Sequence, residues 1–394
     1  MKIAFYFKGQ NQRSSLPIVR ARVREGINHI PWVELILAST NPKIVLDDYL
    51  GQKAALEAYT SAAGSQVTVA RWKGRIFEFG RVDTAWTSEK LFAYRAVIRS
   101  SLWTLAYSQR SRALRNVSRP EALKKVFKEA GITGFKLLEP LEMKKAHPVL
   151  EQIVQYQQTD LDFVLRLMRL EGMSFFFLPV GLTFQFSSLS DPSDYFRVTD
   201  GHPRLSEQKS PLIVKYQPHT GMVTSSLHID SVTWQSRVVP QEMSVQSYFS
   251  ASNYQAYAPT GGKRKVEGGT LGDLYRVEGT TARSKQNSGW TPQDYADKIT
   301  QVRAEELSWW HSQGAGTSND INLRPCLLIT MSPDPFEQGS GNQKPQYQIV
   351  EVEHQWHLPP GSQGDAQYQN AFTMTAKDAP LRPAEVTPWP KGAA

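Results

Sequence analysis

Cysteine is nearly absent from this sequence of 394 residues, since Cys326 is the only one. A single cysteine excludes an internal disulfide and a zinc site built from several cysteines. Cys326 begins the apolar run CLLIT, and a cysteine in such a run is typically a buried structural thiol rather than a reactive one.

Long hydrophobic runs are also absent. No stretch of 18 or more apolar residues occurs, so the sequence predicts no membrane-spanning helix. The N-terminal run MKIAFYF is too short for the core of a signal peptide, and no small-residue cleavage site follows it. We therefore expect the chain to be made and folded in the cytoplasm, and any export to use another route than general secretion.

The common catalytic motifs are missing as well. There is no G-x-S-x-G elbow and no G-x-x-x-x-G-K-[ST] phosphate loop. Gly314 and Gly316 begin a G-x-G pattern, but Asn319 stands where the third glycine would be. We interpret Gly314 as the residue that ends a helix, followed by a loop.

Two groups of residues could be mistaken for chemical sites. Glu351, Glu353, His354 and His357 form E-x-E-H-x-x-H, but within a predicted strand the two histidines point to opposite faces, which favours a structural or solvent-facing role over a metal site. Asp160 and Asp162 could suggest a glycosidase pair. They fall in the first turn of a predicted helix, where acidic residues favour the helix dipole. We expect no catalytic residue, cofactor or metal.

The positive charge is concentrated near the N-terminus. Residues 1–130 hold 22 Lys and Arg against 10 Asp and Glu, whereas the remaining residues hold 23 against 27. Such a basic segment could bind nucleic acid, an acidic membrane or an acidic protein, or it could be a solvated face. No zinc-finger or RNA-binding motif accompanies it, so nucleic acid is the less favoured reading.

Alternation of apolar and polar residues predicts antiparallel strands over most of the chain, among them 33–37, 66–72, 75–79 and 94–99. Three segments carry helix start and stop signals instead. The first, 118–131, begins with a capping box formed by Ser118 and Glu121. The second covers 159–172. The third, 291–313, follows Thr291 as N-cap and has Pro292 at its first position.

A pattern of strands recurs 273–275 residues further along the chain. Leu50, 75–79, Tyr94 and Val97 correspond to Leu323, 348–352, Tyr368 and Phe372. Alternating strands resemble one another, so chance similarity is one explanation. The other is a duplicated β-barrel, in which each copy buries its inward positions and closes its edges.

Several segments resemble the VgrG family of type VI secretion spike proteins and the related hubs of contractile phage baseplates. The similar segments are 102–112, 116–120, 154–173, 322–325, 347–354 and 379–388. The most specific is 154–173, whose signature residues are Tyr156, Thr159, Asp160, Leu161, Asp162, Phe163, Glu171 and Gly172. The resemblance extends over roughly residues 16–390, although 240–290 matches poorly.

The resemblance implies a mainly β fold with α+β insertions, containing two tube-protein-like β-barrels and smaller α/β subdomains. It implies a first barrel in 1–106, an α/β insertion with two helices in 107–180, strands returning to the first barrel in 181–235, and a second barrel in 236–380 that carries the third helix. The proline-rich segment 381–394 would be an extended linker toward a spike domain, with Arg382, Pro383, Pro388 and Trp389 facing it.

The implied function is that of a homotrimeric structural hub, which adapts a trimeric spike to a hexameric Hcp-like tube and is exported on sheath contraction. The implied partners are the tube protein, the spike or needle with its tip protein, baseplate wedge components and effectors. Family members usually continue into an oligonucleotide-fold domain and a β-helix needle, for which the residues after Pro390 leave no room. Either the spike is a separate polypeptide or this chain is a fragment.

Three other functions stay open at this point. The chain could be the equivalent hub of a phage tail or of an extracellular injection particle. It could be an enzyme acting on cell-wall glycan, which would need two buried carboxylates in a cleft. It could also bind nucleic acid nonspecifically through its basic N-terminal third.

Overall fold

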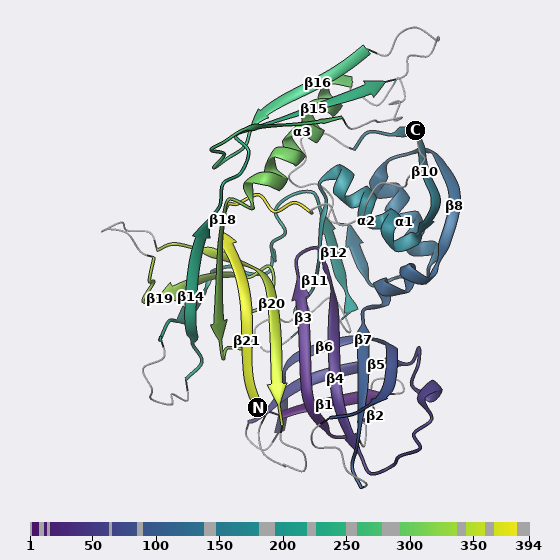
Figure 1. Cartoon of the computed structure of the whole chain (residues 1–394), viewed down its shortest axis with the longest axis vertical. Coiled ribbons are helices and arrows are strands. Elements are labelled where there is room, and N and C mark those ends of the chain that lie inside the picture. Colours follow the sequence, from purple (N-terminus) through teal and green to yellow (C-terminus); the bar gives the residue numbers. More distant parts are fainter. Residues whose placement is uncertain are drawn as a thin grey trace.

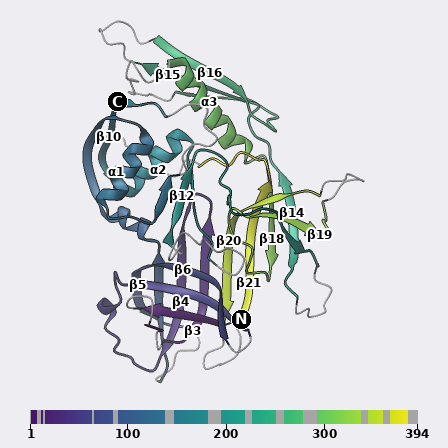
Figure 2. The same ribbon diagram turned by 180° about the vertical axis from the view of Figure 1, so that it is seen from behind.

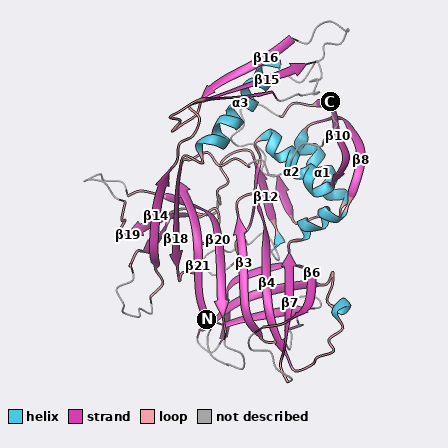
Figure 3. Cartoon of the chain, viewed as in Figure 1, coloured by secondary structure: helices cyan, strands magenta, loops and turns pink. Residues whose placement is uncertain are grey.

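The computed structural model describes residues 2–7, 12–13, 16–62, 65–84, 90–137, 147–180, 194–218, 226–249, 258–277, 292–336, 344–358 and 366–383. Strands dominate, and the three α-helices lie in the upper part of the molecule (Figure 3). Thirteen strands form one sheet that occupies the lower part of the view in Figure 1. No helix in these ranges is long and apolar enough to cross a membrane.

The N-terminal part of this sheet comes from the first hundred residues. Its elements are β1 (Lys2–Phe7), β2 (Gln12–Arg13), β3 (Ile18–Gly26), β4 (His29–Ser39), the 3-10 helix η1 (Leu46–Asp48), β5 (Lys53–Ala62), β6 (Ser65–Val82) and β7 (Phe92–Arg99). The strands pair in the order β3-β4-β7-β6-β5-β1-β2. We call β1, β3, β4, β5, β6 and β7 the first strand set. Their inward side chains, such as Val23, Leu35 and Leu56, form one buried core.

The C-terminal part of the sheet forms a second strand set around its own core. Its members are β13 (Leu212–Lys215), β14 (Ile229–Ser236), β18 (Ser312–Ser318), β19 (Leu328–Ser332), β20 (Tyr347–His357) and β21 (Gln367–Ala376). They pair in the order β14-β18-β21-β20-β19-β13. A parallel bridge between Tyr216 and Ile229 brings the end of β13 beside the start of β14. The second strand set is therefore a curled sheet whose two ends meet at one bridge, which is consistent with the predicted barrel.

The two sets share the repeat that the sequence indicates. β6 pairs with β7, and β20 with β21, and each hairpin has an irregularity at the corresponding place, between Ile76 and Glu78 and between Ile349 and Glu351. Ile349 lies 273 residues after Ile76. In the second strand of each hairpin the registers match Ala96 with Phe372 and Tyr94 with Asn370, so the sequence matches of Val97 and Tyr94 were off by one and two residues. A shared register fault is much more specific than shared alternation, so chance similarity no longer explains the repeat.

The loops before the two hairpins also correspond. Gly51 N–H donates to the carbonyl of Ile76 at 2.8 Å, and Cys326 N–H donates to the carbonyl of Ile349 at 2.9 Å. Both residues have left-handed backbones, with φ of 72° at Gly51 and 69° at Cys326. The counterpart of Gly51 is therefore Cys326. The sequence match of Leu50 with Leu323 was thus two residues off in this loop.

An α/β insertion follows the first set. It contains the 3-10 helix η2 (Ser101–Tyr107), β8 (Gln109–Val117), α1 (Arg119–Glu129), β9 (Phe135–Leu137), β10 (Leu150–Thr159), α2 (Asp160–Glu171), β11 (Ser174–Phe177) and β12 (Phe196–Thr199). β8 and β10 form a two-stranded ribbon, and β11, β12 and β9 a three-stranded sheet. The capping box of Ser118 and Glu121 is present at the start of α1, as the sequence predicts.

A smaller module lies at the far end of the molecule. It consists of the sheet β16-β15-β17, with β15 (Glu242–Phe249), β16 (Ala258–Lys265) and β17 (Asp273–Val277), and of α3 (Pro292–Ser308), which packs against that sheet. Figure 2 shows the module beyond α1 and α2 and separate from the long sheet. The predicted cap Thr291 lies outside the described residues.

One expectation about this organisation was wrong. Residues 181–235 do not return to the first strand set, because β12 joins the insertion while β13 and β14 pair with β19 and β18 of the second. The third helix lies between β14 and β18 of the second set in the chain, and it packs on a sheet of its own.

The third helix also ends earlier than predicted. It stops at Ser308, and β18 begins at Ser312, so Gly314 and Gly316 lie in a strand rather than at a helix end. A Cβ at Gly314 would lie 2.7 Å from the Met374 side chain, and one at Gly316 would lie 2.4 Å from the Ser231 carbonyl oxygen. The glycines are required by neighbouring strands, which a local helix pattern does not reveal.

The two strand sets join where β3 pairs with β20, and a buried polar network crosses this junction. The Glu25 carboxylate accepts hydrogen bonds from Arg324 Nη2 and from Trp72 Nε1, both at 2.9 Å. His354 Nε2 lies 3.1 Å from the same carboxylate, and His354 Nδ1 lies 2.7 Å from the Tyr368 hydroxyl. Burial raises the pKa of Glu25, but Arg324 and His354 outweigh that effect and bring the pKa to about 2.

The uneven charge distribution is partly balanced within the chain. Arginines of the first 130 residues pair with carboxylates from later in the sequence; the pairs are Arg22–Glu353, Arg24–Glu351, Arg110–Asp160, Arg112–Asp160 and Arg119–Glu171. These arginines therefore hold later segments of the same chain, which weakens the case for nucleic acid.

We expect Arg324→Met to lower the free energy of unfolding by about 3–5 kcal/mol, because it leaves the buried Glu25 carboxylate without its main cation. Urea denaturation followed by tryptophan fluorescence measures the loss. Arg22→Met is the matched control, since Arg22 also pairs with a glutamate across the junction but its side chain is 44% exposed. Its loss should stay within about 1 kcal/mol. Equal losses for the two variants would contradict a special role for the buried network.

We also expect the junction to lose stability in acid. Because the pKa of Glu25 is about 2 in the folded chain and about 4.3 in an unfolded one, its contribution is fully present above about pH 5 and is lost as the pH falls toward 2. Burial lowers the pKa of His354, so protonation of that ring also destabilises the fold as the pH falls below about 6.5.

Glu25→Gln should lower the free energy of unfolding at pH 6 but flatten its decline between about pH 5 and 2.5. Unfolding midpoints of both proteins across this range test it, and parallel profiles would refute it.

Candidate functional site

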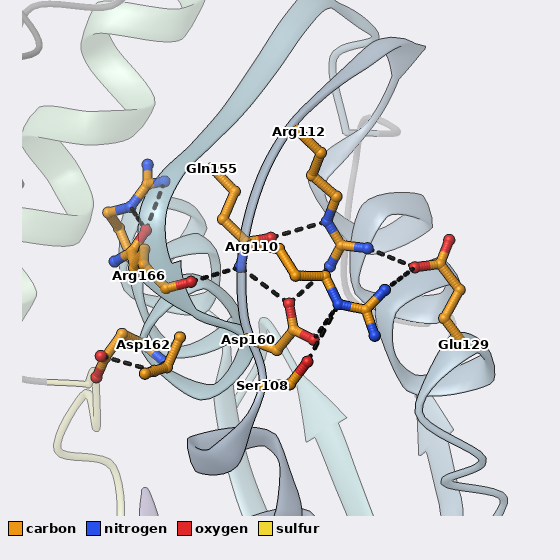
Figure 4. Close-up of polar contacts among 10 residues, drawn as sticks. Ser108, Arg110, Arg112, Glu129, Gln155, Asp160, Asp162 and Arg166 are labelled. Atoms are coloured by element: carbon orange, nitrogen blue, oxygen red, sulfur yellow. Dashed lines mark hydrogen bonds and ion pairs between the residues drawn. The ribbon is translucent and has the colours of Figure 1, made fainter.

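Asp160, a buried carboxylate of the predicted signature, lies at the start of α2, and its side chain is 3% exposed (Figure 4). One of its oxygens accepts hydrogen bonds from Arg112 Nη2 at 3.0 Å and from Gln155 Nε2 at 2.9 Å. The other lies 3.2 Å from Arg110 Nε. Arg110 and Arg112 are two residues apart on β8 and so reach the same side of the ribbon. Asp160 therefore fastens α2 to β8 and β10.

The signature residues Thr159 and Asp162 shape the beginning of α2. The Thr159 hydroxyl accepts a hydrogen bond from the Asp162 N–H at 3.0 Å and donates one to the Asp162 carboxylate at 2.7 Å. The strand before them is irregular between Gln155 and Gln158, and Gln157 has a left-handed backbone with φ of 44°. This irregularity turns the chain sharply from strand into helix.

The arrangement does not suit glycosidase chemistry. Asp160 is bound by two guanidinium groups and Asp162 by the helix cap, and Figure 4 shows the two carboxylates on different sides of the helix start. A cavity of about 500 Å³ beside the end of the second strand set has Glu267 and Asp378 as its carboxylates, and both are exposed. Neither place has the paired buried carboxylates that this chemistry needs.

The signature residue Glu171 forms a second buried cluster at the other end of α2. Its carboxylate pairs with Arg119 of α1, with Lys298 of α3 and with His147, whose Nδ1 lies 2.8 Å away. Burial raises the pKa of Glu171, but Lys298, Arg119 and His147 outweigh that effect and hold the pKa well below its usual range. One carboxylate thus fastens all three helices together.

Gly172 ends α2 with a left-handed backbone, at φ of 68°. A Cβ there would lie 2.6 Å from a methyl group of Val302 on α3, so the position needs glycine for space as well as for conformation. The Gly172 carbonyl accepts a hydrogen bond from Arg382 Nη1 at 2.8 Å. The signature therefore reaches the C-terminal segment.

Arg382 and Pro383 are held within the chain. Arg382 pairs with Glu305 of α3 at 2.6 Å and also donates to the carbonyl of Asp200, while Pro383 is buried. The contacts of Arg382 anchor this segment against α3 and the end of α2, and its orientation toward a spike stays a prediction. Pro388 and Trp389 lie outside the described residues.

The remaining signature residues divide between core and surface. Leu161 and Phe163 are buried in the core of the insertion. Tyr156 on β10 is 51% exposed, and its neighbour Val154 on the same face is 44% exposed. Tyr156 is therefore the most exposed of the predicted signature residues.

The residues considered as metal ligands do not converge. His354 is buried in the junction network, whereas His357 is exposed, so the two rings point to opposite faces, as the strand pattern predicts. Glu351 and Glu353 are held by arginines of β3. Within the described part of the chain, no group of three or more potential ligands is arranged for a metal ion.

Sequence reasoning missed several residues that matter here. Arg110 and Arg112 could have been found, because two arginines with strand spacing next to the signature block suggest a buried acidic partner. Glu25 and its partner Arg324 are 299 residues apart, and no local pattern connects them.

Known proteins share both sequence and fold with this chain. A family model described as the phage tail baseplate hub (GPD) matches residues 24–359. The type VI secretion system spike protein VgrG1b of Pseudomonas aeruginosa is 24% identical over 276 residues, which make up 68% of this chain and 36% of that protein. VgrG1c of the same organism is 29% identical over 164 residues, 41% of this chain and 21% of that protein. The chain thus spans only about a fifth to a third of the length of these relatives.

Solved structures support the fold. A type VI secretion component of E. coli, described as similar to the T4 bacteriophage tail proteins gp27 and gp5, has a TM-score of 0.60 and 15% identity, covering 97% of this chain and 80% of that one. The 43 kDa tail protein of prophage MuSo2 from Shewanella oneidensis has a TM-score of 0.61 and 11% identity, covering 97% and 100%. The predicted resemblance to VgrG and the mainly β hub fold are confirmed. Since the family model covers most of its residues, this chain belongs to the phage tail baseplate hub family.

Proposed function

We propose that this hub protein forms a homotrimer that adapts a three-fold spike to a six-fold tube in a contractile injection machine. The observation that carries the proposal is the pair of similar strand sets joined side by side through β3 and β20. Three copies of a chain with two such units present six similar units, so the same molecule can match a trimer on one side and a hexamer on the other.

The clusters around Asp160 and Glu171 support a mechanical role. In each cluster a buried carboxylate is bound by several cationic partners from other elements. The clusters therefore resist separation of the three helices and of the β8–β10 ribbon. Arg382 fixes the segment that leads out of the fold, where a spike would be attached. Such rigid fastening suits a part that transmits force.

The proposed partners are a hexameric tube protein, a spike with its tip, baseplate wedge components and effectors. The curated relatives are named spike proteins, and one of Vibrio cholerae is named an actin cross-linking toxin, with 23% identity over 86% of this chain and 28% of that protein. We propose no enzymatic activity for this chain, because the carboxylates that its signature supplies are bound in structural pairs. Export would follow from delivery by the machine itself.

A phage-tail hub is the second candidate, and the near-complete structural match to the MuSo2 tail protein favours it. The mechanics would be the same and the tube protein different. Binding of the purified chain to a type VI tube hexamer or to a phage tail-tube protein distinguishes the two.

We expect the purified chain to have the mass of three copies in multi-angle light scattering, either alone at high concentration or after addition of a separately produced spike region. Negative-stain class averages of that species should show a ring with six similar lobes. The concentration series matters, because a weak trimer dissociates on dilution.

A mass of one chain at every concentration, with and without the spike region, would refute the symmetry-adapting function. A dimer would refute it as well, since two chains offer four units and cannot match a hexamer.

A further inference from the structure

We propose that neighbouring copies join by pairing β14 of one chain antiparallel with residues 78–82 of β6 of the next, repeating between chains the β3–β20 junction seen within each chain. The inference rests on the proposed trimer and names the strands that would close it. It follows from a strand-by-strand correspondence between the two sets.

The two sets correspond in strand order, and all but the last pair of strands correspond in direction. The first set pairs in the order β3-β4-β7-β6-β5-β1 and the second in the order β14-β18-β21-β20-β19-β13. The repeat of the two hairpins matches β6 with β20 and β7 with β21, so the neighbours match in turn, β4 with β18 and β3 with β14. The pairs up to β5 and β19 are antiparallel in both sets; the last pair is antiparallel in one and parallel in the other.

The registers agree residue by residue. A row of directly paired residues runs through Phe79, Ala96, Leu35 and Ala21 in the first set, and its counterpart runs through Val352, Phe372, Gly316 and Val232 in the second. The strand β14 therefore occupies in the second set the position that β3 occupies in the first.

The junction within the chain joins an edge of the second strand set to an edge of the first. Residues 351–357 of β20 pair with residues 20–26 of β3. By the correspondence, the equivalent edges are the end of β6 and the outer edge of β14. A chain that repeats its internal junction with a second copy must use these two edges.

Both edges are open among the described residues. β6 pairs with β5 through residues 65–75 and with β7 through residues 75–82, and the loop at Gly51 and Gln52 bonds to Ile76. This leaves 78–82 without a strand on the β5 side. β14 is the terminal strand of the sheet order, paired with β18 alone apart from the bridge at Ile229. An open edge of this kind is a template for strand addition.

The two edges are different surfaces of the chain. Six strands separate β14 from β6 in the sheet order. An interface between different patches is heterologous, and it forms a closed ring when the rotation between copies allows.

The correspondence also fixes the register of the new junction. Gln355 pairs with Arg22 and Glu353 with Arg24 inside the chain. Their counterparts place Val82 opposite Thr233 and Gly80 opposite Gln235 of the neighbouring copy.

The side chains on the outer face of this junction are compatible. Thr233 and Gln235 are exposed, and a Cβ at Gly80 would have no atom within 4 Å in the isolated chain. Uncharged residues meet there, so the new junction lacks the like-charge repulsion that would oppose pairing.

The test is an engineered disulfide between Gly80 and Gln235. Directly opposed residues of antiparallel strands have Cα atoms about 4.5–5.5 Å apart, which is within the range that a disulfide bridges. Gly80→Cys with Gln235→Cys should give, after oxidation under the trimer-forming conditions, a covalent species of three chains on a non-reducing gel. Cys326 is buried and does not compete.

Gly80→Cys with Ser236→Cys is the matched control. A shift of one residue turns the second thiol to the other face of the strand, so little cross-linked product should form. Mixing chains that carry only Gly80→Cys with chains that carry only Gln235→Cys should give dimers and no larger species, which shows that the bond joins two chains. Thermal unfolding of the reduced variants checks that they fold as the parent does.

The outcomes separate this inference from the proposed function. A trimeric mass without the Gly80–Gln235 bond, or with equal cross-linking in the control, would overturn the strand pairing and leave the trimeric hub intact. Absence of any trimeric mass, with the spike region present, would overturn both.

Discussion

The buried carboxylate of Glu25 is the interaction on which the arrangement of the two strand sets depends. It lies on β3, and it is bound by side chains from β6, from β20 and from the loop before β19. A buried charge is tolerated only when its partners are in place. If the strands slid or separated, the carboxylate would lose its partners and the fold would lose several kcal/mol of stability, about 3–5 kcal/mol for a broken buried pair. Hydrophobic packing would stabilise either set alone, whereas this network specifies how one set is placed against the other.

The same device recurs in the helical part of the molecule. Asp160 fastens α2 to the ribbon beneath it, and Glu171 fastens α2 to α1 and α3. Each joins elements that are distant in sequence through charge-assisted hydrogen bonds, which have stricter geometry than apolar contacts. The predicted signature residues therefore include those that hold the parts of this chain together.

Much of the fold could be predicted because its signals are local. Alternating strands, the capping box at Ser118, the turn from strand to helix at Thr159 and the glycine after α2 are all determined within a few residues. The repeat could be recognised as well, since both hairpins keep their apolar rows. The end of α3 and the strand containing Gly314 could not be predicted, because close packing by Met374 decides them. The placement of β13 and β14 depends on pairing with strands about a hundred residues later, and the role of Arg382 depends on partners that only the folded chain brings near.

Cys326 occupies the position that Gly51 holds in the other half, and it keeps the left-handed backbone although it carries a side chain. A non-glycine residue in this conformation costs on the order of 1–2 kcal/mol, which the surrounding contacts must offset. Its thiol is buried in a cluster that includes Phe176 and Leu178 of the insertion, and burial raises its pKa well above the usual range, so it reacts poorly while that cluster is closed. The rate at which a thiol reagent labels this residue therefore measures how often the second strand set separates from the insertion.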